Sequence, residues 1–212
     1  MGFIGVLVGA GIATGTTMYF ASRAERDQRL AVAHSVFFKV LKMCDVAVKV
    51  ARHVSEEWKE DRNGWHWPAL MPLAGIPPLD DTFTAEEMAL FARAKGPVFS
   101  ERLLVASNHS HLILELLRNY NSDRRALGDT FAEMGLVEMD GPIGRIIVDK
   151  ESDTHRLLAP KIREVETGAI HLREAALKAR DHITKLGDDI GPKLKEVLKD
   201  DRFKLNMGSK PD

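Results

Sequence analysis

Three long segments of the chain repeat apolar residues at alternating steps of three and four, and this repeat limits the fold more than any other feature. Such spacing lines the repeated side chains along one stripe of an α-helix, as in coiled coils and helical bundles. The first stripe consists of Leu30, Ala33, Phe37, Val40, Cys44, Ala47, Ala51, Val54 and Trp58. The second consists of Phe99, Leu103, Ala106, Ser110, Ile113, Leu117, Tyr120, Arg124, Leu127, Phe131 and Met134. The third consists of Leu158, Ile162, Val165, Ala169, Leu172, Ala176, Ala179, Ile183, Leu186 and Ile190.

These stripes predict an all-α fold: an antiparallel bundle of three long helices, with short helices besides, over residues 23–202. A short helix is expected to begin at the capping box formed by Thr84 and Glu87. Gly191-Pro192 predicts a break before a last short helix. The segment GRIIVDK is the nearest candidate for a strand, but an isolated strand has no partner. Residues 203–212 are expected to form a disordered tail.

Residues 1–22 contain no Asp, Glu, Lys, Arg or His, and a helix needs roughly 20 apolar residues to cross a bilayer. Tyr19 and Phe20 lie where interfacial aromatic residues are common. We therefore expect a permanent transmembrane anchor at residues 1–22. The Gly-rich run VGAGIATG is also compatible with a dinucleotide-binding loop, but no second strand ending in an acidic residue follows it. A cleaved signal peptide would begin with basic residues, and none precedes the apolar run.

The glycines of this segment fall on two sides of the expected helix. At about 100° per residue, Gly2, Gly5 and Gly9 share one face, and Gly11 and Gly15 lie nearly opposite. Because glycine lets membrane helices approach closely, the first face is a candidate helix–helix contact that would form a homo-oligomer. The alternative is a span that merely tolerates glycine.

Three arginines set the expected orientation of the anchor. Arg23, Arg26 and Arg29 follow the apolar run, and no basic residue precedes it. Positive charge is enriched on the cytoplasmic side of membrane spans. The sequence therefore predicts a single-pass membrane protein whose body lies on the cytoplasmic face.

Composition and spacing disfavour several classes of function. The chain carries 30 basic and 31 acidic residues, without the excess of positive charge that marks a nucleic-acid-binding surface. Cys44 is the only cysteine, and its place in the first stripe predicts a buried, unreactive thiol. His109 and His111 point about 200° apart on a helix and cannot share an ion. His53 and Glu57 share a face, but two ligands alone form a weak site. We expect no catalytic, cofactor-binding or metal-binding residues.

A connector at residues 62–83 is rich in Trp and Pro, and its four prolines limit regular structure there. Packed down, it would cap the open end of the bundle. Exposed, it would be a recognition loop, since Trp and Met are favoured at interfaces. Its candidate interaction residues are Trp65, His66, Trp67, Leu70 and Met71.

Two polar residues interrupt the second stripe. Ser110 and Arg124 stand where apolar residues are expected. A buried arginine must find a carboxylate or another acceptor, and a lone polar residue often fixes helix register or oligomeric state. The alternative for Arg124 is a position at the bundle edge, with only its aliphatic stem covered.

These features favour a membrane-anchored scaffold, tether or assembly factor that acts through protein–protein contacts, with a partner that the sequence does not identify. A sensor or signalling module is the first alternative, because a continuous first helix can relay a helix shift. An enzyme or cofactor binder with a site inside the bundle is the second, and it requires a pocket with converging polar groups.

Overall fold

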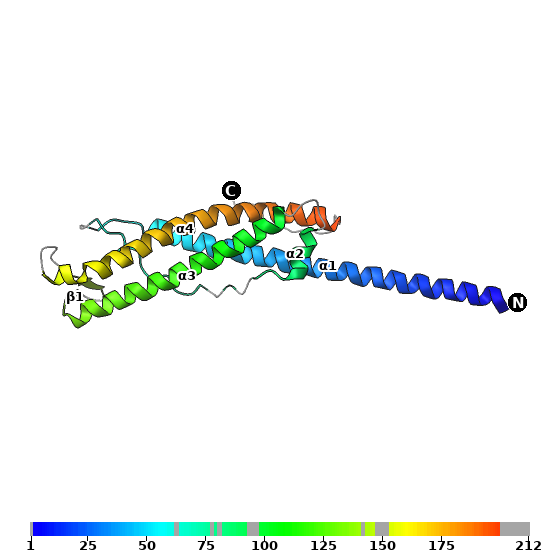
Figure 1. Cartoon of the computed structure of the whole chain (residues 1–212), viewed down its shortest axis with the longest axis horizontal. Coiled ribbons are helices and arrows are strands. Elements are labelled where there is room, and N and C mark those ends of the chain that lie inside the picture. The colour runs from blue at the N-terminus through cyan, green and yellow to red at the C-terminus, as the bar shows by residue number, and fades with distance from the viewer. Residues whose placement is uncertain are drawn as a thin grey trace.

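The computed structural model describes residues 2–61, 64–76, 79, 82–92, 98–140, 143–146 and 153–199, and their side chains except those of residues 2–16, 92 and 138–146. Four helices occupy most of this part: α1 (Gly2–Glu56), α2 (Ala85–Ala92), α3 (Val98–Glu133) and α4 (Asp153–Leu198). The long helices α1, α3 and α4 lie side by side, and the short α2 packs near the end from which α1 projects (Figure 1). The predicted helical bundle is confirmed.

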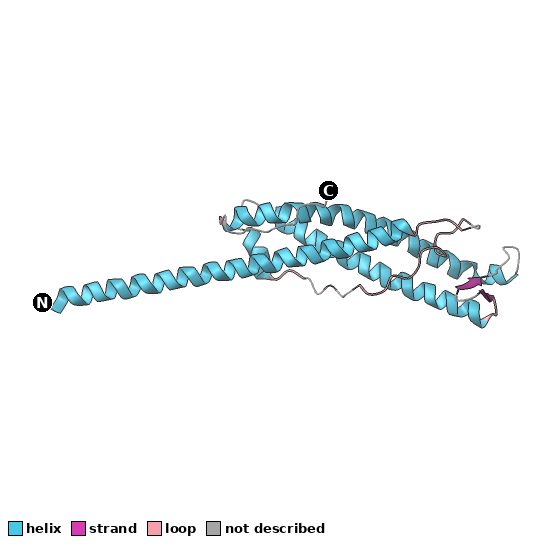
Figure 2. Cartoon of the chain, turned by 180° about the vertical axis from the view of Figure 1, so that it is seen from behind, coloured by secondary structure: helices cyan, strands magenta, loops and turns pink. Residues whose placement is uncertain are grey.

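α1 is a single unbroken helix whose N-terminal half projects beyond the bundle (Figures 1 and 2). All side chains from residue 17 to residue 29 are exposed, including Met18 at 68%, Tyr19 at 62% and Phe20 at 63%. Contacts between α1 and the bundle begin near Gln28, whose side-chain amide donates to a Glu86 carboxylate oxygen of α2 at 2.7 Å. No proline or glycine lies between Ala21 and Glu56, so nothing local interrupts the helix between its free and its packed halves.

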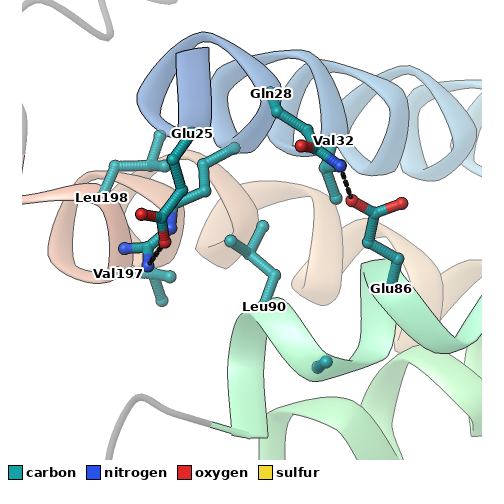
Figure 3. Close-up of a pocket in the computed structure, with 9 residues that line it drawn as sticks. Glu25, Gln28, Val32, Glu86, Leu90, Val197 and Leu198 are labelled. Carbon is teal, nitrogen blue, oxygen red and sulfur yellow. Dashed lines mark hydrogen bonds and ion pairs between the residues drawn. The ribbon is translucent and has the colours of Figure 1, made fainter. Parts of the chain in front are cut away.

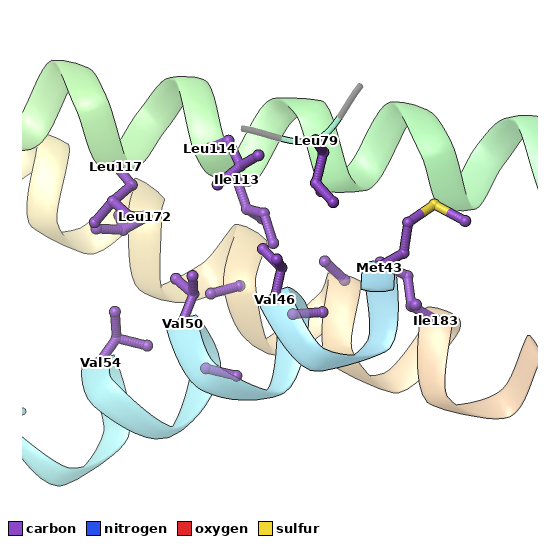
Figure 4. Packing of buried hydrophobic residues seen from close by; sticks show 14 of the residues in the cluster. Met43, Val46, Val50, Val54, Leu79, Ile113, Leu114, Leu117, Leu172 and Ile183 are labelled. Carbon is purple, nitrogen blue, oxygen red and sulfur yellow. The ribbon is translucent and has the colours of Figure 1, made fainter. Parts of the chain in front are cut away.

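The predicted stripes form the core of the bundle (Figure 4). Every residue of the third stripe is buried, and in the second only Arg124 and Met134 are not. In the first stripe, only Leu30, Cys44 and Trp58 are half-buried rather than buried. Complete burial of one aliphatic side chain contributes about 1.5–3 kcal/mol, so these stripes supply most of the driving force for folding.

The direction of α3 differs from the prediction. Near the start of the bundle, Lys39 of α1 forms an ion pair with Glu87 of α2, which directly precedes α3. Near the end of α1, His53 bonds the carbonyl of Met71, and the residues just before Met71 contact Tyr120, far along α3. α1 and α3 are therefore parallel and α4 is antiparallel to both, rather than each helix reversing the last (Figure 1).

The cause of this arrangement is the connector between α1 and α2. Its described residues run back along the bundle between α1 and α3, so the chain has already reversed before α3 begins (Figure 2). Leu79 is buried and belongs to the same apolar core as Met43 and Ile113 (Figure 4). The connector therefore occupies the place that a fourth helix would take in a four-helix bundle.

A short hairpin between α3 and α4 corrects the expectation of no strand. Strand β1 (Val137–Asp140) pairs antiparallel with β2 (Ile143–Ile146), which brings Val137 opposite Ile146 and Asp140 opposite Ile143. GRIIVDK thus does have a partner. Asp140-Gly141 joins the two strands in the sequence, and this dipeptide favours tight hairpin turns.

The predicted break at Gly191-Pro192 is wrong, because α4 continues through it to Leu198. Proline inside a helix removes one backbone hydrogen bond and costs about 3 kcal/mol. The apolar stripe runs on past the proline, however, and both Ile190 and Leu194 are fully buried. Burial of these two side chains offsets the local cost.

Among the described residues, no helix contains a stretch long and apolar enough to cross a membrane. Most of the predicted anchor at residues 1–22 belongs to the part of α1 whose side chains lie outside the described residues. The same holds for the predicted contact face of Gly2, Gly5 and Gly9. The predicted tail at residues 203–212 also lies outside the described residues.

Candidate functional site

The Trp-containing part of the connector is held against α4 by one carboxylate. Glu166 accepts hydrogen bonds from the backbone amides of His66 at 2.9 Å and Trp67 at 3.0 Å, and it contacts His66 Nδ1 at 2.8 Å. The His66 ring stacks on Trp58 of α1 with centroids 4.1 Å apart. The guanidinium of Arg173, from α4, lies over the Trp58 ring, 4.8 Å from its centre. One side chain of α4 therefore fixes the backbone of the connector as well as its histidine.

α3 holds the next part of the connector through backbone carbonyls. The Tyr120 hydroxyl donates to the Leu70 carbonyl at 2.6 Å and lies 3.2 Å from that of Trp67. Asn121 donates to the Leu73 carbonyl at 3.0 Å. Burial raises the pKa of Tyr120 well above its ordinary value, so the hydroxyl keeps its proton and remains a donor. These bonds satisfy carbonyls that a proline-rich segment cannot satisfy in a helix or sheet.

The predicted interaction residues do not form one exposed loop. Trp67 is 4% exposed, Leu70 is fully buried, and Trp65 and His66 are half-buried. Met71 is 52% exposed and is the one member of the group that faces solvent to that degree. The described part of the connector is thus packed down along the side of the bundle, and of the five candidate interaction residues only Met71 is exposed.

The two polar residues of the second stripe have different roles. Ser110 is buried, and its hydroxyl donates to the Ala106 carbonyl one turn earlier at 3.0 Å, so it needs no partner from another helix. Arg124 is half-buried, and its guanidinium lies 3.4 Å from the carbonyls of Trp67 and Pro68. Both alternatives for Arg124 therefore hold in part, since it lies at the bundle edge and still finds backbone acceptors.

His53 and Glu57 contact the connector as well. His53 Nε2 lies 2.8 Å from the Met71 carbonyl, and Glu57 accepts the Met71 amide at 2.9 Å. The prediction that His53 and Glu57 share a face is confirmed, and both side chains on that face bond the backbone of Met71. The backbone N–H and C=O of Met71 are thereby both bonded, which fixes the backbone at this residue.

A second polar cluster joins α1 to the start of α2. Thr84 and Glu87 form the predicted capping box. The Thr84 backbone N–H donates to the Glu87 carboxylate at 2.7 Å, and the Glu87 backbone N–H donates to the Thr84 hydroxyl at 3.2 Å. Glu87 also accepts from Lys39 and Ser35 of α1, each at 2.7 Å. Burial by itself would raise the pKa of Glu87, but the bonds from Lys39, Ser35 and Thr84 outweigh it and lower that pKa. The carboxylate is therefore charged and ties two helices together.

A pocket of about 260 Å³ opens where α1 leaves the bundle (Figure 3). Its apolar wall combines Val32 of α1, Leu90 of α2, and Val197 and Leu198 at the end of α4. Its polar rim is internally paired, since Arg29 donates to Glu25 at 2.5 Å and Gln28 donates to Glu86. The pocket accordingly presents an apolar wall behind a paired rim.

Cys44 lies in the narrow contact between α1 and α4. It is half-buried, and its thiol donates to the Ile183 carbonyl at 3.3 Å. Burial, with Asp188 nearby, raises the pKa of Cys44 to about 11. At neutral pH the thiol therefore keeps its proton, and the thiolate is the nucleophilic form.

No family model, curated protein or solved structure matches this chain. Within the described residues, the polar side chains that the sequence singles out are used mainly to hold the connector and the helices in place. Several of the contacts that hold the connector join residues 50 to 100 positions apart in the sequence, as between Tyr120 and Leu70 or His66 and Glu166. Spacing along one helix therefore does not reveal them.

Proposed function

We propose that this chain is a single-pass membrane protein whose residues 1–22 form the anchor and whose helical bundle lies on the cytoplasmic face. There the bundle acts as a scaffold, tether or assembly factor through protein–protein contacts. The observation that carries the proposal is the projecting half of α1, which the rest of the chain leaves uncovered from residue 17 to residue 29.

An exposed helix with the composition of residues 1–22 would be unstable in water. Residues 1–22 carry no charged side chain, and a helix that is apolar all round is normally buried in protein or lipid. Glycine also makes an isolated helix less stable in water, by up to about 1 kcal/mol at each position. Lipid would cover this surface and favour the helix, because its backbone hydrogen bonds are internal.

The residues between the anchor and the bundle fit such a location. Residues 23–29 would extend about 10 Å as a helix and contain three arginines and two acidic residues. Such a segment can lie among lipid headgroups. Because α1 continues from it into the core, the bundle would be held at a fixed height above the membrane.

Membrane extraction tests the anchor. We expect the full chain to stay in the membrane pellet after alkaline carbonate treatment, and a variant lacking residues 2–22 to move to the supernatant. A matched control lacks residues 203–212 and should pellet like the full chain. If the full chain is released by carbonate, residues 1–22 are not a membrane anchor.

Cysteine labelling tests the orientation. The variant Cys44→Ala with Ser209→Cys carries one thiol, placed near the C-terminus. In intact cells an impermeant maleimide should leave this thiol unlabelled, and it should label the thiol after the membrane is opened. Labelling in intact cells would place the bundle on the opposite face.

Proximity labelling tests the interaction role. A labelling enzyme fused to the C-terminus of the full chain should mark a reproducible set of membrane-associated proteins that the variant lacking residues 2–22 does not mark. Identical sets from both chains would contradict a role that depends on the membrane location.

The continuous α1 also supports the alternative of a signalling module. A shift of the anchor along its axis would pass directly into the core, because no break separates residues 17–29 from the first stripe. Insertion of two glycines after Asp27 distinguishes the two functions. A relay would lose its output with the anchor intact, whereas a scaffold would keep its set of neighbours.

A further inference from the structure

Two histidines from different helices meet on the outer side of the bundle. His109 of α3 and His182 of α4 approach with their Nδ1 atoms 3.3 Å apart, and the rings are nearly parallel at 12° with centroids 5.0 Å apart. The pair crosses 73 positions of sequence. His111 points away, and it is exposed. The spacing argument that separated His109 from His111 is thus correct, and the partner of His109 comes from α4.

The separation of the two nitrogens fits a metal ion. Zinc binds histidine nitrogen at about 2.0–2.1 Å in tetrahedral geometry, which places two nitrogen ligands about 3.3–3.4 Å apart. The observed 3.3 Å has that value. In the hydrogen-bonded pair the two Nδ1 atoms point toward each other, so each ring would turn by about 35° for both to face one tetrahedral ion. His182 is exposed and His109 is half-buried at the surface, which leaves room for that rotation.

We propose that His109 and His182 bind a divalent transition-metal ion, with zinc as the best-fitting example, through their Nδ1 atoms. The ion would bridge α3 and α4, and water would fill the other positions. In the ring that now donates, the proton would move from Nδ1 to Nε2 by exchange with water, so each ligand stays a neutral imidazole. Imidazole ligands suit zinc, copper and nickel and select against magnesium and calcium.

The surroundings of the pair determine how strongly it binds. In the described part of the chain no three or more His, Cys, Asp or Glu side chains converge on one point, so the protein supplies two ligands. Lys178 of α4 lines the same cavity of about 370 Å³ as His109. The positive charge of Lys178 opposes a cation, so binding is weaker than at a structural zinc site.

Thermal unfolding of the full chain, in a mild non-ionic detergent and without a histidine tag, tests the site. With zinc at about ten times its dissociation constant, the melting temperature should rise by roughly 3–6 °C, because the ion binds only the folded bundle. His109→Ala and His182→Ala should each abolish the rise. His111→Ala is the matched control, on the same helix but facing away, and it should keep the full rise. Magnesium should have no effect on any of the four proteins.

The possible outcomes separate clearly. No rise with zinc in the unmodified chain overturns the proposal, and so does an equal rise in all four proteins, which would place the ion elsewhere. Because His182 is exposed, we expect His182→Ala to fold. Its change of melting temperature with zinc therefore tests the site even if His109→Ala does not unfold cooperatively. In the unmodified chain, zinc should shift the imidazole Nδ1 resonances of two histidines in the nitrogen NMR spectrum. Shifts confined to Nε2 resonances would also contradict the assignment.

Discussion

Replacement of Gly187 by alanine adds one methyl group where α4 packs against Cys44 of α1. A Cβ atom built on Gly187 would lie 2.7 Å from the Cys44 sulfur, well inside the normal contact distance. Gly187 is helical, and alanine in a helix is more stable than glycine by about 0.5–1 kcal/mol. Overpacking of this kind costs about 1–3 kcal/mol. We therefore expect Gly187→Ala to lower the free energy of unfolding by roughly 0.5–2 kcal/mol.

Removal of the sulfur should reverse the sign of this effect. In a Cys44→Ala background no atom would oppose the new methyl group, and only the helical preference of alanine would remain. Gly187→Ala should then raise the free energy of unfolding by about 0.5–1 kcal/mol. The difference between the two backgrounds is a coupling energy of about 1–3 kcal/mol, as expected for residues in direct contact.

Urea unfolding of four proteins measures this coupling: the unmodified chain, each single variant and the double variant. In thermal melts, 1 kcal/mol corresponds to about 2–4 °C for a chain of this size. Gly128→Ala is the matched control, because Gly128 is helical and no atom lies within 4 Å of its Cβ position. It should stabilise the protein equally with and without Cys44. If Gly187→Ala has the same effect in both backgrounds, the close approach of α1 and α4 at this point is refuted.

Three further changes test other parts of the molecule. Val54→Asp places a carboxylate in the core and should lower the free energy of unfolding by several kcal/mol. Glu60→Ala, at a side chain 68% exposed, should change it by under ~0.5 kcal/mol. Equal losses of melting temperature in the two variants would contradict the packing of α1. Because the pKa of Glu87 is lowered on folding, its contribution is present above its ordinary value of 4.5 and is lost as pH falls through the lower folded value. Acid titration of stability should therefore be shallower in Glu87→Gln, and unchanged steepness would show that the ion pair with Lys39 does not form. In a reporter of association between membrane spans, Gly9→Ile should weaken the signal and Ile12→Leu should not, and equal signals would exclude the glycine face.

The buried face of each long helix is predictable from the sequence, because one element determines its own periodicity. The third stripe illustrates this, since all ten of its residues are buried in the structure. The direction of α3 is not predictable in this way, because it depends on where the connector packs. That packing rests on contacts such as those of Glu166 with His66 and of Tyr120 with Leu70, which join residues at least 50 positions apart.

The same distinction applies to individual residues. A rule for one isolated position fails at Pro192, because burial of Ile190 and Leu194 on either side of it offsets the cost of the proline. The pairing of His109 with His182 carries no signal in either helix alone. By contrast, the capping box of Thr84 and Glu87 is predictable, since it needs only a spacing of three residues.

The packing of α1 against the last helix affects how the chain folds as it leaves the ribosome. Cys44 and Ile183, which touch in the folded protein, are 139 positions apart. At about 5–20 residues per second, the first helix waits about 7–30 s before its main partner is synthesised. During that interval its apolar stripe lacks this partner, and a tether to the bilayer would keep nascent chains apart. A chain that stops before Asp153 lacks the helix that covers most of the stripe, so we expect such fragments to aggregate or to be degraded.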